Sequence, residues 1–306
     1  MKTKIYVPDI ECDSCVKLLH RKFKHTEGVT EYDVTHDSVD VTYDETIIEA
    51  KELVEMIEEM GFRASKTPFE RKTFSERWRD LRQNPYKYEM PLKAAYYSIA
   101  IFLILSLLEI IAYFAFFTTT PGFIAKHAIW FLYLNITVAS LGATLWYMTS
   151  YKGTVTCMTG MMIGMTVGMQ AGMMIGAVMG GTNGFFTGAL VGMFVAVILG
   201  TITGAVCGIM GAVQGMMTGV MAGTMGAMIT VMMFTDHVLI FMPFYMIINV
   251  LVLGGLIYIF YEEVVEGKKD VKKKTIDFTT FASLSIIATT LLIIIMVYGP
   301  KSPLFS

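Results

Sequence analysis

The chain has 306 residues, of which 54% are hydrophobic and only 16% are charged, which is too apolar for an ordinary soluble two-domain protein. The charged residues are concentrated in residues 1–93 and are sparse in residues 94–260. The net charge of -2 at pH 7 gives no indication of a nucleic-acid partner. The composition therefore predicts a soluble head followed by a membrane domain that is surrounded by lipid.

The head is predicted over residues 1–66. In this region, segments with the two-residue apolar period of strands alternate with segments that have the roughly 3.6-residue period of helices. A strand through Ile5 and a helix ending near Phe23 come first. Two strands, a second helix closed by Gly61 and a last short strand at residues 62–65 follow. The order β-α-β-β-α-β predicts a ferredoxin-like α+β fold. Because the first residues lack a secretory signal pattern, we expect this head to lie in the cytosol.

Two cysteines, Cys12 and Cys15, lie on the loop between the first predicted strand and the first predicted helix. The unpaired N–H groups at a helix N-terminus stabilise thiolates. Two soft sulfurs at this spacing suit a linear Cu(I) site. A redox Cys-x-x-Cys pair and two bystander thiols are the alternatives, although a thioredoxin-like redox site needs a longer fold.

The head resembles the heavy-metal-associated (HMA) domain of copper chaperones and metal-pumping ATPases. The matching residues are the two cysteines, Gly28 with Val29 before the second strand, and Gly61 with Phe62 after the second helix. The resemblance implies that Cys12 and Cys15 bind the metal ion and that Phe62 packs near the site. It also implies that the head binds a heavy-metal ion. A cytosolic metallochaperone is a candidate partner of the head.

One feature departs from the usual family pattern, because Ile10 and Glu11 replace the family's Met-Thr before the first cysteine. Glu11 and Asp13 resemble the zinc-pump variants of the domain. A carboxylate beside two thiolates adds a harder ligand, which favours Zn(II) or Cd(II) over Cu(I). The head by itself therefore leaves the metal open between Cu(I), Zn(II) and Cd(II).

A basic juxtamembrane segment is predicted over residues 67–91. Phe74, Trp78 and Leu81 lie at helical spacing and are opposed by arginines and lysines, which is typical of a helix lying on the cytoplasmic leaflet. A charged flexible linker is the alternative. Either structure tethers the head beside the bilayer.

Seven transmembrane helices are predicted in residues 92–298, with residues 299–306 as an external tail. The expected spans are residues 92–117, 124–150, 154–180, 184–208, 211–234, 239–261 and 276–298. The boundary between the fourth and fifth spans is marked only by a phase slip in the glycine pattern between Gly208 and Gly211.

The distribution of Lys and Arg predicts the orientation of these spans. Residues 71–93 and 268–274, together with Lys152, fall on one side, whereas Lys126 and Lys301 fall on the other. We therefore expect a multi-pass protein of the plasma membrane with a cytosolic N-terminus and an external C-terminus.

Glycine and methionine dominate residues 155–235, which hold 17 of the 25 methionines and 18 of the 27 glycines. Glycines recur at every fourth position, and such small-residue faces let helix backbones approach closely. We therefore expect a tight inner bundle over residues 154–234. Methionines follow the same step in two stripes, Met161, Met165, Met169 and Met173 on the third span and Met217, Met221 and Met225 on the fifth.

The methionine stripes have two interpretations. Neutral thioethers bind Cu(I) without adding fixed charge to the membrane, which indicates a metal pathway. Methionine is also a flexible apolar filler, which indicates packing alone. Inward-facing sulfurs would favour transport, and outward-facing sulfurs would favour a structural role.

Further candidate ligands lie at the ends of the predicted spans. Cys157 and Cys207 are expected at the cytosolic ends of the third and fourth spans, where they form a thiol site facing the head or are two unrelated buried residues. Asp236 and His237 are expected at the external side near His127 and give a candidate harder site, although exposed loops often hold such residues.

An ionisable residue, Glu109, lies within the first span. Because a charge there is costly, we expect it to carry a coupling proton or to line a pathway.

Neither a Gly-x-x-x-x-Gly-Lys phosphate loop nor an Asp-Lys-Thr-Gly phosphorylation motif occurs in the sequence, so we expect no nucleotide and no enzyme activity. The regular four-residue spacing of Met and Gly resembles the sequence motifs of the copper-transporter (CTR) family. This similarity is limited to the motifs, and no residue roles are transferred from it. The sequence predicts membrane transport or homeostasis of a soft metal, with Cu(I) as the first candidate.

Two alternatives to Cu(I) transport are a non-transporting membrane metal sensor, store or chaperone and a Zn(II) or Cd(II) transporter. A homo-oligomer is compatible with each of the three.

Overall fold

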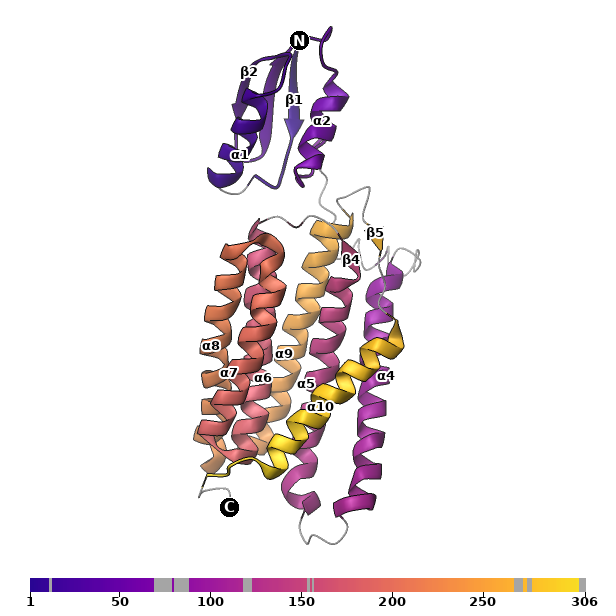
Figure 1. The fold of residues 1–306 in the computed structure, drawn as a ribbon, viewed down its shortest axis with the longest axis vertical. Helices are drawn as coiled ribbons and strands as arrows, with labels where there is room; N and C mark the ends of the chain where they lie inside the picture. The colour runs from indigo at the N-terminus through magenta and orange to yellow at the C-terminus, as the bar shows by residue number, and fades with distance from the viewer. Residues whose placement is uncertain are drawn as a thin grey trace.

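The structure is a computed structural model that describes residues 1–10, 13–68, 79, 88–117, 123–152, 155, 157–266, 272–273 and 277–302. Figure 1 shows a small head at one end of an elongated helical body, with the C-terminus near the opposite end of that body. The end of the body beside the head is called the head-side end below, and the opposite end is called the far end. The predicted juxtamembrane helix at residues 67–91 lies almost entirely outside the described residues.

The head contains a three-stranded antiparallel sheet covered by two helices (Figure 1). Strand order in the sheet is β1-β3-β2, so the third strand in the sequence lies in the middle. The elements are β1 (Lys2–Tyr6), α1 (Asp13–Lys24), β2 (Val29–Val34), β3 (Ser38–Tyr43) and α2 (Ala50–Glu59).

Apolar residues from all parts of the head meet between the sheet and its helices. Ile5 from β1, Val39 and Val41 from β3, and Leu53 and Ile57 from α2 are completely buried. The alternation along the strands and the spacing of about 3.6 residues along the helices place these side chains on one face of each element. The predicted ferredoxin-like arrangement of the head is confirmed.

The last predicted strand is shorter than expected. Residues 62–65 form a single antiparallel bridge in which Tyr6 donates its N–H to the carbonyl of Ser65 at 2.8 Å and Ser65 donates to Tyr6 at 3.0 Å. A fourth strand was predicted at residues 62–65, and the structure has a single β-bridge there. The backbone N–H of Arg63 donates to the carboxylate of Asp9 at 2.8 Å, so a side chain and not a neighbouring strand accepts this bond.

Seven helices are long and apolar enough to cross a membrane, which confirms the predicted number within the part of the chain that the structure describes. They are α4 (Glu89–Ala112), α5 (Phe123–Thr149), α6 (Cys157–Asn183), α7 (Phe185–Gly204), α8 (Ile209–Met232), α9 (Val238–Phe260) and α10 (Phe278–Tyr298). Short π-helical or 3-10 segments extend α4 at Tyr113–Phe117, α7 at Ala205–Cys207, α8 at Met233–Thr235 and α9 at Tyr261–Glu266.

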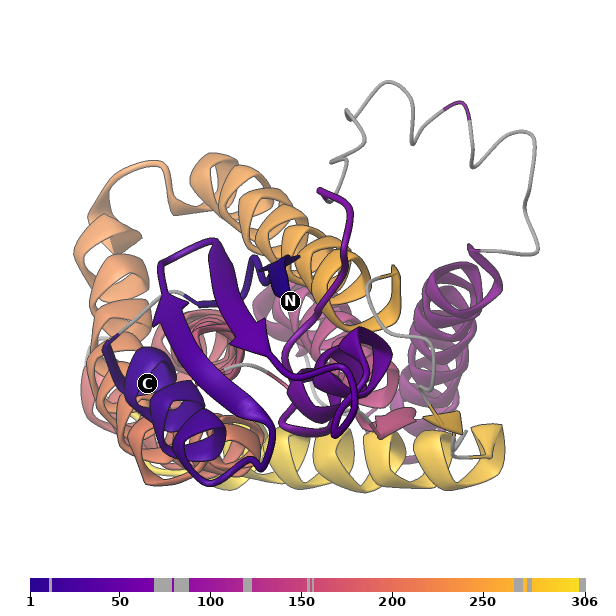
Figure 2. The same cartoon turned by 90° about the horizontal axis from the view of Figure 1, so that it is seen from above.

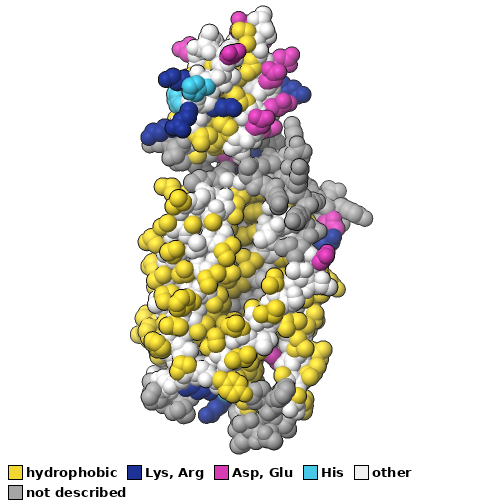
Figure 3. Space-filling view, viewed as in Figure 1, with side chains coloured by type: hydrophobic (Ala, Val, Ile, Leu, Met, Phe, Trp, Pro, Cys, Tyr) yellow, Lys and Arg dark blue, Asp and Glu magenta, His cyan; other side chains and the backbone are white. Residues whose placement is uncertain are grey.

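The outer surface of this body is apolar, as lipid requires. Figure 3 shows hydrophobic side chains over most of the visible face of the body, while charged side chains gather on the head. Leu103, Leu107 and Phe194, for example, are all more than half exposed. Helices that are apolar all round are typical of membrane spans, so the chain is a multi-pass membrane protein.

Glycine produces the closest helix contacts of the fold, among α6, α7 and α8. A methyl group on Gly164 would lie 2.6 Å from the Cα of Gly204, and one on Gly172 would lie 2.6 Å from the backbone N of Gly223. Only a residue without a side chain permits such approaches. Figure 2 shows these three helices together on one side of the body, with α4 separate on the other.

Two sharp turns connect the three glycine-rich helices. Gly184 between α6 and α7 has φ +97°, and Gly208 between the 3-10 segment and α8 has φ +96°. Both values lie in the left-handed region that glycine tolerates without a steric penalty. The weak boundary predicted between the fourth and fifth spans is therefore a single glycine turn at Gly208.

The far end is fixed by polar contacts between α10 and the α6–α7 turn. The Asn183 side chain donates to the carbonyl of Ile295 at 3.2 Å, and Ser302 donates its N–H to the Asn183 carbonyl at 2.9 Å. The hydroxyl of Thr187 donates to the Pro300 carbonyl at 2.9 Å. These bonds hold the end of the oblique helix α10 against the bundle (Figure 1).

A two-residue strand pair joins two connections at the head-side end. Tyr151 and Lys152 of β4 pair antiparallel with Lys273 and Lys272 of β5. The pairing gathers basic residues at the end of the body that faces the head.

Candidate metal centre

The metal-binding loop predicted in the head is only partly described. Cys15 lies in the first turn of α1, is half-buried and packs against the core of the head. Glu11 and Cys12 lie outside the described residues, as does the side chain of Asp13. The structure therefore places one of the two predicted thiols at a helix N-terminus, where thiolates are stabilised.

The chain leading to the two cysteines is fixed by its own contacts. Val7 and Ile10 are buried in the head core, and Val7 donates its N–H to the carbonyl of Asp37 at 2.9 Å. Ile10 stands where the family's methionine is usual, and its side chain is 1% exposed. This apolar side chain anchors the chain in the core of the head immediately before the cysteine-bearing segment.

An ion pair between Asp9 and Arg63 also fixes the chain that leads to the two cysteines. The Asp9 carboxylate accepts bonds from Arg63 Nε at 2.9 Å and from Nη2 at 2.5 Å. Burial lowers the pKa of Arg63, but the hydrogen bond and charge of Asp9 outweigh it and raise that pKa above its ordinary value. Sequence analysis did not identify this pair, since no local pattern connects residues so far apart.

The aromatic residue implied by the HMA resemblance lies in the core of the head. Phe62 is 9% exposed and belongs to the same apolar cluster as Ile10, with Cys15 packed against that cluster. The preceding Gly61 has φ +94°, which allows the chain to turn directly from α2 toward Phe62.

The membrane domain carries its own thiol at the head-side end. Cys207 ends the 3-10 segment after α7 and is half-buried. A methyl group on Gly160 of α6 would lie 2.8 Å from the Cys207 sulfur, and one on Gly211 of α8 would lie 2.6 Å from it. The sulfur therefore lies where α6, α7 and α8 meet.

Cys157 begins α6, three residues before Gly160, although its side chain lies outside the described residues. Because Gly160 touches Cys207, the first turn of α6 and the end of α7 are neighbours. The structure thus brings the two predicted membrane cysteines to the same end of the same three-helix bundle.

An acidic residue joins this region from the π-helical segment that extends α9. Glu263 accepts a short hydrogen bond from the hydroxyl of Thr159, which lies between Cys157 and Gly160 on α6. The sequence offered no signal for this contact, because the two residues are separated by 104 positions. It places a carboxylate beside the thiol end of the bundle.

The loop side of the head faces this end of the membrane domain. Figure 1 shows the end of β1 and the start of α1 on the side of the head directed toward the body. The charges of Glu262 and Glu263 contribute to raising the pKa of Arg63. The thiol-bearing parts of the head and of the membrane domain therefore lie at facing surfaces.

The predicted methionine stripes lie largely on the outer surface of the single chain. Met217, Met221 and Met225 of α8 are 59%, 59% and 43% exposed. On α6, Met165 is 41% exposed, and Met161, Met169 and Met173 are half-buried. The glycine seams take up the inner faces of these helices, so the sulfurs are directed away from the bundle axis.

One polar contact links the two stripes. The Gln214 side chain of α8 donates to the sulfur of Met165 on α6 at 3.6 Å. This bond orients a thioether in the outer part of the α6–α8 groove.

The candidate external site is separated into two parts. His237 Nδ1 lies 2.6 Å from Asp236 Oδ1, and both side chains are exposed. His127 is buried and stacks on Phe123 with a ring-centroid distance of 4.7 Å. Among the described residues no group of three or more His, Cys, Asp and Glu side chains has a geometry that could hold a metal ion.

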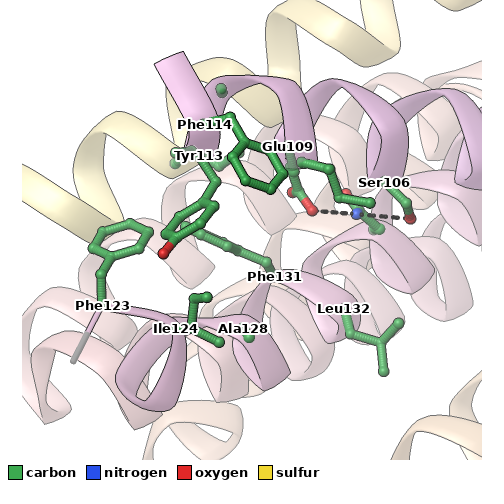
Figure 4. Close-up of a pocket in the computed structure, with 13 residues that line it drawn as sticks. Ser106, Glu109, Tyr113, Phe114, Phe123, Ile124, Ala128, Phe131 and Leu132 are labelled. Atoms are coloured by element: carbon green, nitrogen blue, oxygen red, sulfur yellow. Dashed lines mark hydrogen bonds between the residues drawn. The ribbon is translucent and has the colours of Figure 1, made fainter. Parts of the chain in front are cut away.

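Glu109 occupies a polar position between α4 and α5. Its Oε2 accepts a hydrogen bond from the Asn135 side chain at 2.7 Å, and Asn135 also donates to the Ser106 hydroxyl at 3.4 Å (Figure 4). Glu109 lies far from the thiol end of the body. It is close to the C-terminal end of α4, which is at the far end of the membrane domain.

Comparison with known families supports the assignment of the head. Residues 4–63 match the family model of the heavy-metal-associated domain. This match spans about a fifth of the chain. No curated protein and no solved structure matches the chain.

The fold and the match together define a class of protein. Residues 4–63 are a heavy-metal-associated domain, which implies that the head binds a heavy-metal ion. The domain is followed by seven helices of membrane-spanning length and composition. The chain is therefore a multi-pass membrane protein with an HMA head.

Proposed function

We propose that this protein handles a soft metal ion, Cu(I), at the plasma membrane and exchanges it between the head and the thiol end of the membrane domain. The observation that carries the proposal is that the start of α1, with Cys15, faces the end of the bundle that holds Cys207 (Figure 1). In this proposal Cys12 and Cys15 hold the ion in the head, and Cys157 and Cys207 receive or deliver it.

Ligand exchange between two thiol pairs suits a soft monovalent ion. Thiolates bind Cu(I) in linear or trigonal geometry, so an incoming sulfur can join before an outgoing one leaves. No oxidation or reduction accompanies the transfer, and the ion is never released to water. Glu263, hydrogen-bonded to Thr159 beside this end, adds negative charge where the cation arrives.

The proposed orientation places the head in the cytosol. Lys152, Lys272 and Lys273 lie together at the head-side end through the β4–β5 pair, as the positive-inside rule requires of a cytoplasmic surface. An inside-negative potential then favours inward movement of a monovalent cation by about 2.3 kcal/mol per 100 mV. Export would need a coupling ion or a partner.

The outward position of the methionines favours a second candidate function, a non-transporting membrane sensor or store. Close contacts between Gly200 and Gly215 and between Gly176 and Gly192 fill the axis of the three-helix bundle. A sulfur pathway would therefore run along the outer faces of α6 and α8, and transport along it needs a second copy of the chain to cover those faces. A store needs no such cover.

A Zn(II) or Cd(II) transporter draws its support from Glu11 and Asp13 near the head thiols. These ions also prefer carboxylate and imidazole ligands in the membrane domain. The described residues hold no group of three such ligands, which makes this the weakest of the three candidates.

Metal flux into liposomes tests these candidates. Purified full-length protein is reconstituted, and Cu(I) and Zn(II) fluxes are compared for the wild type and for a Met165→Leu, Met169→Leu variant. A Met242→Leu, Met246→Leu variant is the matched control, because these two methionines are buried in α9 away from the stripes.

Selective Cu(I) flux that is lost only in the first variant would support transport along the methionines. No flux, with one Cu(I) still held by the head, would support the sensor or store. Faster flux of Zn(II) than of Cu(I) would support the third candidate.

A further inference from the structure

A cavity of about 470 Å³ opens between α4 and α5 near the far end of the membrane domain. Residues at its rim, among them Ile110, Phe114, Ile124 and Leu132, are all more than 40% exposed on the outer surface of the chain. Figure 3 shows an acidic side chain among hydrophobic side chains in the lower part of the body. The cavity is thus open toward the region that lipid occupies.

The floor of this cavity is polar. Glu109, Asn135 and Ser106 line it and form the hydrogen-bonded group drawn in Figure 4. Glu109 is the only ionisable acid or base among the described lining residues apart from the Tyr113 phenol. A carboxylate at this depth is costly unless it has a function or a partner.

Two acceptor atoms of this group have no hydrogen-bond donor within the described part of the chain. They are Oε1 of Glu109 and Oδ1 of Asn135, and both atoms are buried. Asn135 already uses its amide group to donate to Glu109 and to Ser106. Buried acceptors are normally paired, so the missing partner has to supply N–H or O–H donors.

Aromatic rings form the walls around these acceptors. Figure 4 shows Tyr113 and Phe114 from the end of α4 and Phe123 and Phe131 from α5 around the opening. Aromatic faces attract cations, and this attraction is strongest where water is excluded. Rings, a carboxylate and an apolar rim together are the complement of a molecule with an ammonium head and an apolar body.

We propose that this cavity binds an amphipathic amine that enters from the membrane, with its ammonium group at Glu109 and Asn135. Both oxygens are buried beneath the cavity surface, so a rotation of the Glu109 and Asn135 side chains brings them to the ammonium, which then supplies donors to both and balances the charge of the carboxylate. None of the described lining residues carries sulfur or imidazole, so the site is distinct from any soft-metal site. The proposal is independent of the metal function.

A second cavity provides an internal comparison. It measures about 430 Å³, lies against α10, and is lined by Val138, Trp146, Phe281, Leu284 and other apolar residues. Its described lining contains the hydroxyls of Thr149 and Ser285 but no ionisable side chain. A cavity of nearly the same size therefore lacks the feature that selects a cation.

The test uses binding of radiolabelled 4-phenylbutylamine, which is protonated at pH 7, to full-length protein in lipid nanodiscs, with empty nanodiscs as the background. Two matched variants fill one cavity each. Ala128→Phe fills the Glu109 cavity and Ala288→Phe fills the second cavity, and both alanines are exposed at a cavity lining. Glu109→Gln removes the charge while keeping the shape of the side chain.

We expect saturable binding to the wild type, at least a tenfold loss of affinity in Glu109→Gln, loss of binding in Ala128→Phe, and no change in Ala288→Phe. The N,N,N-trimethyl derivative has no N–H donor and should compete at least tenfold more weakly than the amine. If Glu109→Gln does not fold, the Ala128→Phe and Ala288→Phe pair still decides the result. Wild-type binding by Ala128→Phe, absence of saturable binding, or equal competition by the neutral 4-phenylbutanol would overturn the proposal.

Discussion

Asp9 and Arg63 lie at opposite ends of the head sequence and form a forked ion pair, with 2.9 Å between Arg63 Nε and Asp9 Oδ1. The second carboxylate oxygen accepts the backbone N–H of Arg63 at 2.8 Å. Both side chains are largely buried, with Asp9 5% and Arg63 16% exposed. Because Asp9 directly precedes Ile10, this pair connects the chain that leads to the two cysteines with the C-terminal edge of the domain.

Removing the charge of Asp9 should loosen the metal loop. Asp9→Asn keeps the shape of the side chain but leaves the Arg63 guanidinium without a carboxylate, which costs about 1–3 kcal/mol in a buried hydrogen-bonded pair. Hydrogen exchange of the backbone amides of Val7, Asp9 and Ile10, measured by mass spectrometry on the full chain, should become roughly 5- to 150-fold faster. Asp33→Asn changes an exposed carboxylate on β2 and is the control. Equal exchange in both variants would contradict the proposed role.

The glycine seams should tolerate no methyl group. A Cβ on Gly200 of α7 would lie 2.5 Å from the carbonyl oxygen of Gly215 on α8, so Gly200→Ala should force the helices apart and cost about 1–3 kcal/mol. Gly254 of α9 has open space around it, and Gly254→Ala should be neutral or stabilising because alanine favours the helix. Thermal unfolding of the two variants in the same detergent distinguishes a tight interface from a general intolerance of alanine.

The thiol end of the membrane domain should bind Cu(I) independently of the head. In a Cys12→Ser, Cys15→Ser variant we expect one Cu(I) to remain bound, because the proposed function assigns a second thiol site to Cys157 and Cys207. Adding Cys207→Ser should weaken that remaining site at least tenfold in competition with a chromogenic Cu(I) chelator. Adding Met210→Leu, which changes an exposed side chain near the same turn, is the control. Full loss of Cu(I) in the head variant alone would contradict this second site.

The orientation predicts which lysines are accessible from outside the cell. Lys301 is exposed at the far end and should react with a membrane-impermeant amine reagent on intact cells. Lys272 and Lys273, which lie at the head-side end, should react only after the membrane is permeabilised. Mass spectrometry of the labelled peptides measures both, and the reverse pattern would place the head outside.

The sequence was sufficient for the features that repeat along the chain. Uninterrupted apolar segments predicted all seven helices, since lipid leaves no other way to satisfy the backbone. The alternation of strand and helix periods predicted the order of elements in the head, and the match to residues 4–63 agrees with it. Regular glycine spacing predicted the closely packed bundle, because a helix places every fourth residue on one face.

The sequence alone could not predict whether the methionine side chains point into the bundle or away from it. Glycine and methionine recur with the same step, so spacing alone cannot say which stripe points inward. In the structure the glycine stripe takes the interface, since only glycine permits contacts such as that of Gly223 with the backbone of Met193. The methionines, with Met221 as an example, are left on the outer surface.

What the sequence determined by itself is the inventory: an HMA head, seven apolar helices, many cysteine and methionine sulfurs, and Glu109 within the first span. Only the tertiary structure decided which of these residues are neighbours, because contacts such as Asp9 with Arg63 and Glu109 with Asn135 join separate elements. Local periodicity reports which face of an element is apolar, and it carries no information about which other element covers that face. Contacts between separate elements therefore decided that the thiol end faces the head and that a cavity opens beside Glu109.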